Sequence, residues 1–247
     1  YHFTLIFSTL SKTLPELKGL NFNSDNAFYI DKPVADRDSI TYWIRDPAIY
    51  QKDSLQMQMS FLQTDSTGQL HNKTDTLMLN PKLKWARIVS MQKDKVESWK
   101  KAQKKNAKKG LEVDSVMPPE PLEVQYEQSL TTDPDKNVYF TFQEPISRLD
   151  TSKIHLDLKV DSIYKPARFL IRQTPEDLKT YELLGAWKMG QEYKVTVDST
   201  AFTGLYGKLS PKMEIALKFK KPEEYSTLFL HLQNTESCAI VQLLDKS

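Results

Sequence analysis

The segment Leu55-Gln56-Met57-Gln58-Met59-Ser60-Phe61 places an apolar side chain at every second position and a polar side chain between them. The same alternation returns in residues 193–197 and 215–219. Successive side chains of a β-strand point to opposite faces, so this period predicts antiparallel sheets with one buried face. Turn sequences such as Asp65-Ser66-Thr67-Gly68 separate the segments. We therefore predict an all-β fold of tandem Ig-like, antiparallel β-sandwich modules with a lysine-rich, partly helical insert.

The composition is that of a globular chain. Of 247 residues, 39% are hydrophobic and 27% are charged, which excludes an intrinsically disordered chain. No apolar run approaches the ~18 residues that cross a bilayer, and the length predicts about two domains. Cys238 is the only cysteine, so no disulfide can form within the chain. Because the chain begins at Tyr1, we expect a fragment or processed form whose targeting segment lies upstream.

A weak internal repeat predicts where the modules lie. Residues 28–34 resemble residues 140–146, and residues 40–50 resemble residues 154–164. The separation is about 110 residues, which fits one Ig-like sandwich per copy. In each copy we expect a strand that ends at a proline and a second strand that runs into a tyrosine. The predicted division is 1–16, a strand continuing from an upstream module; 17–83, the first module; 84–118, the basic insert and linker; 119–219, the second module; and 220–247, the start of a third β-module, beginning with a hairpin.

The insert concentrates the basic residues of the chain. Residues 84–109 hold ten basic residues and two acids, whereas the whole chain has a net charge of only +2. Charge placed in one insert does not indicate a nucleic-acid-binding protein. Trp85, Ile88, Val89, Val96 and Trp99 fall near helical spacing, which predicts an amphipathic helix followed by a solvated helix or loop that ends at Gly110. The candidate partner contacts are Lys93, Lys95, Lys100, Lys101, Lys104, Lys105, Lys108 and Lys109.

No motif in the sequence indicates an enzyme or a metal site. The four histidines are far apart in sequence, Cys238 has no basic neighbour, and seven glycines do not form a phosphate-binding loop. Asp133, Asp135, Asn137 and Glu144 imitate the oxygen positions of a calcium loop, but Val138 stands where the sharp bend needs glycine. We predict no cofactor. A carbohydrate platform would need exposed tryptophans, whereas a buried tryptophan is the commoner role in a sandwich.

Several phrases of the sequence resemble one bacterial family. The phrases are Leu17-Lys18-Gly19-Leu20-Asn21-Phe22, Asp38-Ser39-Ile40-Thr41-Tyr42-Trp43-Ile44, Asp150-Thr151-Ser152-Lys153-Ile154, Tyr181-Glu182-Leu183-Leu184-Gly185-Ala186-Trp187 and Ile240-Val241-Gln242-Leu243-Leu244. They are similar to the Ig-like domain-containing lipoproteins of Bacteroidetes, which begin with an SbsA-type Ig-like domain behind a lipoprotein signal. The resemblance implies a lipid-anchored outer-membrane protein whose leading Ig-like domain and anchor cysteine lie upstream. It carries no catalytic residue onto this chain.

The leading hypothesis is a non-catalytic interaction module of the cell envelope. It would be an accessory lipoprotein that docks onto an outer-membrane protein complex, with the basic insert as a contact. No nucleic acid is expected as a partner, and the membrane is expected to be reached only through the upstream anchor. The alternative is a surface glycan-binding module, which predicts an exposed row of aromatic side chains. A hydrolase would need two carboxylates facing each other about 5–10 Å apart across a cleft.

Overall fold

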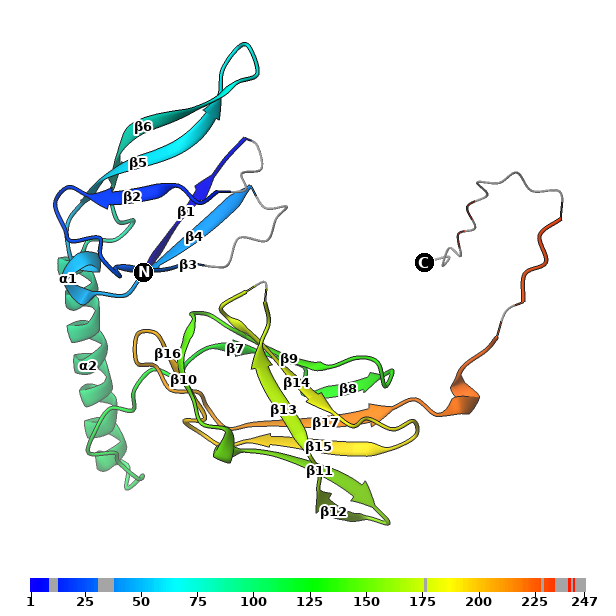
Figure 1. The fold of residues 1–247 in the computed structure, drawn as a ribbon. Helices are drawn as coiled ribbons and strands as arrows, with labels where there is room; N and C mark the ends of the chain where they lie inside the picture. The colour runs from blue at the N-terminus through cyan, green and yellow to red at the C-terminus, as the bar shows by residue number, and fades with distance from the viewer. Residues whose placement is uncertain are drawn as a thin grey trace.

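The computed structural model describes residues 1–8, 13–30, 38–175, 177–227, 229–233, 240 and 242. Over these residues the chain forms 17 strands, two short 3₁₀ turns and only two α-helices. The prediction of an all-β, sandwich-type fold is therefore confirmed. Figure 1 shows two groups of strands with the long helix α2 (Trp85–Lys108) between them along the chain.

The first group consists of two three-stranded antiparallel sheets. Alternation in the sequence sets the buried face: in β5, Leu55, Met57 and Met59 are buried, while Gln56 and Gln58 are exposed. The core between the sheets contains Ala27, Ile44, Ile49, Leu55 and Met57. One sheet has the order β1 (His2–Ile6), β4 (Ser39–Ile44), β3 (Phe28–Ile30); the other has the order β2 (Glu16–Gly19), β5 (Leu55–Thr64), β6 (Leu70–Leu79); the short helix α1 (Pro47–Tyr50) follows β4.

The second group is larger and has its own core, running from Leu122 to Phe219. In its last strand every second residue is buried, from Met213 to Phe219. One sheet has the order β12 (Ile163–Pro166), β11 (Ile154–Val160), β15 (Glu192–Val197), β17 (Met213–Phe219), β8 (Ser129–Thr132). The second has the order β13 (Phe169–Gln173), β14 (Thr180–Gly185), β9 (Val138–Phe142), β7 (Val124–Gln125), and a two-stranded pair joins β10 (Ile146–Leu149) to β16 (Phe202–Gly204). The 3₁₀ turns are η1 (Thr151–Lys153) and η2 (Pro222–Glu224), and β8 pairs with β17 in parallel.

The structure differs from the predicted division at the start of the chain. We predicted residues 1–16 as a strand that continues from an upstream module, with the first module beginning at residue 17. Instead, β1 pairs with β4 along its whole length, and Phe3 packs on Phe28 and Tyr42. β2 begins at Glu16 and pairs with β5. Residues 1–16 therefore contribute β1, the first residue of β2 and part of the core to the first module.

The internal repeat also differs from the prediction. In the first copy β3 pairs with β4, whereas in the second copy β9 and β11 lie in different sheets. Ile49 and Tyr50 lie on the helix α1, although their counterparts Ile163 and Tyr164 lie on the strand β12. The similar sequences reflect local strand preference, because strand partners are chosen by contacts distant in sequence. The two copies do not share a topology.

The predicted start of a third module, 220–247, lies mostly outside the described residues. The hairpin was expected around Leu228, Leu230 and Leu232, followed by residues 240–244. Of these segments, Leu228, residues 234–239, Val241 and residues 243–247 lie outside the described part of the chain. The described residues 225–227 and 229–233 form no strand, and η2 is the last regular element before them. This prediction stays a prediction.

Candidate functional site

The basic insert forms one long helix, as its apolar spacing indicated. α2 spans 24 residues, contains no fully buried residue and ends before Gly110, whose φ of 70° suits glycine. Its half-buried residues, which include Trp85, Ile88, Val89, Trp99 and Gln103, recur at helical spacing and define one stripe. All eight candidate lysines are exposed, and the last turns carry six of them: Lys100, Lys101, Lys104, Lys105, Lys108 and Lys109.

One candidate lysine is engaged within the protein. The Lys95 ammonium donates to Oε1 of Glu120 over 2.5 Å, and Lys208 of the second module lies 3.7 Å from the other carboxylate oxygen. The hydrogen bond and charge of Lys95 lower the pKa of the Glu120 carboxyl, and the charge of Lys208 adds to this. Lys95 therefore fastens the middle of α2 to the segment that enters the second module. Across the described chain, none of the other seven candidate lysines forms an ion pair.

An aromatic cluster fixes the first turn of α2. The rings of Tyr1 and Tyr50 stack with centroids 3.9 Å apart, and Trp85 packs against both. Tyr206, from the loop after β16, meets Tyr1 edge-on, and its hydroxyl donates to the Tyr1 carbonyl oxygen over 2.6 Å. Burial, together with the negative charge of Glu144, raises the pKa of Tyr206. The cluster thus joins the first module, α2 and the second module at one place, and sequence reasoning did not find it because its members come from four distant segments.

Glu144 contacts the loop that carries Tyr206 to this junction. Its side chain is 5% exposed, and its Oε1 accepts a hydrogen bond from the Tyr206 backbone N–H over 2.9 Å. A Cβ atom on Gly204 would collide with the same carboxylate. Because a buried carboxylate needs partners, Glu144 and Gly204 together hold the loop that carries Tyr206. The calcium-loop imitation noted in the sequence does not assemble here, since Asp133 instead accepts from the Tyr225 hydroxyl over 2.7 Å.

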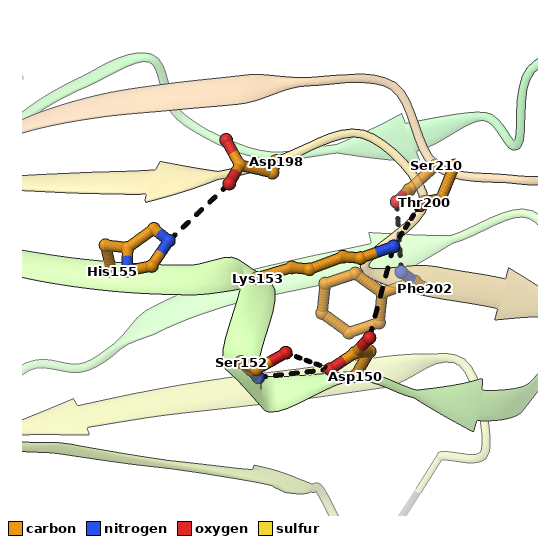
Figure 2. A network of polar contacts seen from close by, with 8 residues as sticks. All are labelled: Asp150, Ser152, Lys153, His155, Asp198, Thr200, Phe202 and Ser210. Carbon is orange, nitrogen blue, oxygen red and sulfur yellow. Dashed lines mark hydrogen bonds and ion pairs between the residues drawn. The ribbon is translucent and has the colours of Figure 1, made fainter.

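A network of polar contacts surrounds the start of β11 (Figure 2). Asp150 Oδ1 accepts from the backbone N–H and hydroxyl of Ser152, as an N-cap of η1 does. The Lys153 ammonium reaches Thr200 Oγ1 over 2.5 Å, and Thr200 has a φ of 67°. The Ser152 hydroxyl thus donates to the carboxylate that caps η1. These contacts fasten the loop before β11 to the loop before β16.

The histidine nearest to this network does not join it. His155 Nε2 lies 3.5 Å from Asp198 Oδ2, and about half of each side chain is exposed to solvent, at 52% and 50%. Figure 2 shows this pair separated from the Asp150 and Ser152 side chains. Among the residues that the structure describes, no group of three or more His, Cys, Asp and Glu side chains could hold a metal ion. The arrangement is a solvent-exposed polar contact between β11 and the residue after β15.

The tryptophans pack against neighbouring groups and form no row. Trp43 is 5% exposed and lies under the ammonium of Lys179, the residue before β14, whose nitrogen is 6.0 Å from the ring centroid. Trp187 stacks on Phe219 with centroids 5.0 Å apart. Trp85 lies in the aromatic cluster, and Trp99 is half-buried on α2. Trp43 therefore adds a second contact between the two modules, since Lys179 belongs to the second.

An open cleft lies where the first module meets the start of α2. Its volume is 610 Å³, and its lining is mainly aliphatic and aromatic, with Lys52 and Lys82 among its residues. Ile44, Ile49 and Leu55 of the core contribute to the lining. The cleft combines segments from β1, α1, β5, the end of β6 and α2. For that reason no local pattern in the sequence could indicate it.

Comparison with known proteins gives no relative from which a role could be transferred. No protein-family model matches the chain, and no curated protein matches it either. None of the helices in the described part of the chain is long and apolar enough to cross a membrane. The function must therefore be argued from the geometry of this chain.

Proposed function

We propose that this chain is a non-catalytic interaction module of the cell envelope. It serves as an accessory outer-membrane lipoprotein that docks onto an outer-membrane protein complex, and the exposed lysine face of α2 contacts an acidic surface of that complex. The observation that carries the proposal is a 24-residue helix with no buried residue. Six candidate contact lysines on α2, and Lys109 at its C-cap, form no ion pair in the described part of the chain.

The spacing of the lysines supports a contact with negative charge. Residues four apart on a helix are neighbours, and like charges at that spacing destabilise it by about 0.2–0.5 kcal/mol per pair. The last turns contain several such pairs: Lys100 with Lys104, Lys101 with Lys105, Lys104 with Lys108, and Lys105 with Lys109. A face that served only solubility would be more stable with acids interleaved. An acidic partner surface would relieve this repulsion and accelerate association.

The rest of the chain supports a binding role over a chemical one. In the polar network of Figure 2, Asp150 caps η1 and Lys153 connects two loops. The tryptophans of the described chain are buried or half-buried against other groups, which gives no support to a glycan platform. The aromatic cluster and the Lys95–Glu120 pair hold α2 by its first half. The lysine-rich second half is left to be presented to a partner.

The test is recovery of the partner complex with matched charge variants. Lys101, Lys104 and Lys108 would be changed together to Gln in the full-length protein, which would then be purified from its native envelope. The control changes three exposed lysines of the second module to Gln: Lys136, Lys165 and Lys218. We expect the α2 variant to lose the partner complex and the control to retain it. Equal recovery with both variants, with far-ultraviolet circular dichroism unchanged, would reject α2 as the contact.

A further inference from the structure

In the part of the chain that the structure describes, the strand β6 forms a free edge of the first module. It pairs with β5 over all ten of its residues and is the last strand of its sheet. Figure 1 shows the β5–β6 hairpin reaching beyond β2, and among the described residues no further strand pairs with its far half. A long, exposed edge strand presents unpaired N–H and C=O groups and is a template for another strand.

The register of β5 decides which backbone groups face outward. The Leu20 N–H donates to the Gln56 carbonyl over 2.8 Å, so Gln56 directs its polar groups toward β2. In antiparallel pairing these directions alternate, and Met57 must direct its groups toward Leu77, its partner on β6. The even-numbered residues of β6 therefore present their N–H and C=O groups to solvent. They are Leu70, Asn72, Thr74, Thr76 and Met78.

The sequence of β6 makes this edge complementary to itself. If two copies of β6 run antiparallel with Thr74 opposite Thr74, each Lys73 lies opposite the partner's Asp75. The apolar side chains also match, because Leu70 comes to lie opposite the partner's Met78. Both are exposed in the single chain, Leu70 at 65% and Met78 at 60%. Every residue opposite an outward-facing residue is then itself outward-facing, which antiparallel pairing requires.

Protection of the edge strand against pairing is a second explanation for the charges of Lys73 and Asp75, but it does not account for their order. A lone lysine on an edge strand repels a second copy and guards against pairing. Here Asp75 follows Lys73 on the same face, with 3.3 Å between the ammonium and carboxylate. That order turns repulsion between two antiparallel copies into two ion pairs related by a two-fold axis. Such an isologous, closed contact is the commonest symmetry of homo-oligomers.

We propose that β6 is a homodimer interface at which two copies of this chain pair antiparallel about Thr74, joining their three-stranded sheets into one. The occupant is a second copy because the register satisfies both the charges and the two exposed apolar side chains. Opposite charges directly across two strands stabilise pairing, and like charges weaken it. This contact lies on the first module and is separate from the lysine face of α2.

The first experiment measures self-association of the purified protein by sedimentation velocity over a range of concentrations. We expect a dimer for the unchanged chain. Lys73→Asp should weaken association by roughly tenfold or more, because two ion pairs become two like-charge contacts. The exchange Lys73→Asp with Asp75→Lys should restore it, and Lys52→Asp, a charge reversal elsewhere in the module, should leave it unchanged. A monomer at all concentrations for the unchanged chain would overturn the proposal.

The second experiment tests the register, in a Cys238→Ser background. Thr74→Cys should form a disulfide between two copies under oxidation, because directly opposite residues lie about 5.5 Å apart between Cα atoms, within disulfide reach. In the same register the two Thr76 residues are displaced by four positions, roughly 13 Å along the strand, so Thr76→Cys should not cross-link. Cross-linking at position 76 and not at 74, or dimers insensitive to Lys73→Asp, would also overturn the proposal.

Discussion

The two modules have separate cores, and Phe202→Ala is the substitution that separates their stabilities most sharply. Phe202 is 0% exposed, and its ring packs on Phe142, Tyr181 and Phe140 at centroid distances of 4.5, 5.6 and 6.0 Å. Removing a buried phenylalanine costs about 3–5 kcal/mol, because transfer free energy is lost and a cavity remains. A domain is stable by only about 5–15 kcal/mol, so the second module would lose a substantial share of its stability.

The assay is native-state hydrogen exchange read by mass spectrometry for each strand. In Phe202→Ala, amides of β9 and β17 should lose about 3–5 kcal/mol of protection, since both strands line the same core. Amides of β5 should keep theirs, because no residue of the second core belongs to the first. Tyr139→Ala is the matched control: Tyr139 lies on β9 beside Phe140 but is 50% exposed. It should change protection by no more than about 0.5 kcal/mol.

Two results would refute this reasoning. Equal loss of protection in β5 and β9 would mean that the modules unfold as one unit, with the junction at Tyr206 and Trp43 as strong as the cores. A loss below about 1 kcal/mol in β9 would mean that Phe202 is not enclosed as described, because a packed phenylalanine cannot be removed so cheaply.

Three further outcomes follow from single contacts. Gly204→Ala should lower the stability of the second module by about 1–3 kcal/mol in urea unfolding, since the added methyl group collides with Glu144. Lys194 and Lys212 lower the pKa of Glu214 to about 2. These ion pairs therefore stabilise the fold above pH 4.5, and their contribution is lost as the pH falls toward 2. In Glu214→Gln, the urea midpoint should depend less on pH over this range. Lys95→Ala should speed hydrogen exchange near Glu120. It should change the unfolding free energy of each module by no more than about 1 kcal/mol.

The spacing of apolar residues in the sequence was sufficient to predict those strands and that helix which bury one face against a core or a neighbouring segment. Strands β5, β15 and β17 lie where the alternation predicted them, because each has one face on a core. The insert became a helix for the same kind of reason, since Trp85, Ile88 and Val89 share one face at a period of 3.6. Gly110 ended it because glycine adopts a positive φ at little cost.

The partners of each strand, and the junction, could not be predicted in this way. Residues 28–30 and 140–142 are similar in sequence, yet β3 pairs with β4 whereas β9 pairs with β14 and β7. The choice depends on side chains far away in the chain. The engagement of Lys95 with Glu120 and the burial of Glu144 under the Tyr206 loop depend on how the modules meet. No local period carries that information.

The two proposed surfaces also reinforce each other through their placement. Figure 1 shows the β5–β6 hairpin on one side of the first module, while α2 extends away from the module on the other side. A dimer formed through β6 would therefore leave both lysine faces free and present two of them to one partner assembly. Linked binding elements can exceed single-site affinity by about 10²–10⁴-fold when geometry permits both to engage. Lys73→Asp should then weaken retention on the partner complex although it leaves every lysine of α2 intact. If retention is unchanged in a variant shown to be monomeric, a single α2 contact suffices and the dimer serves another purpose.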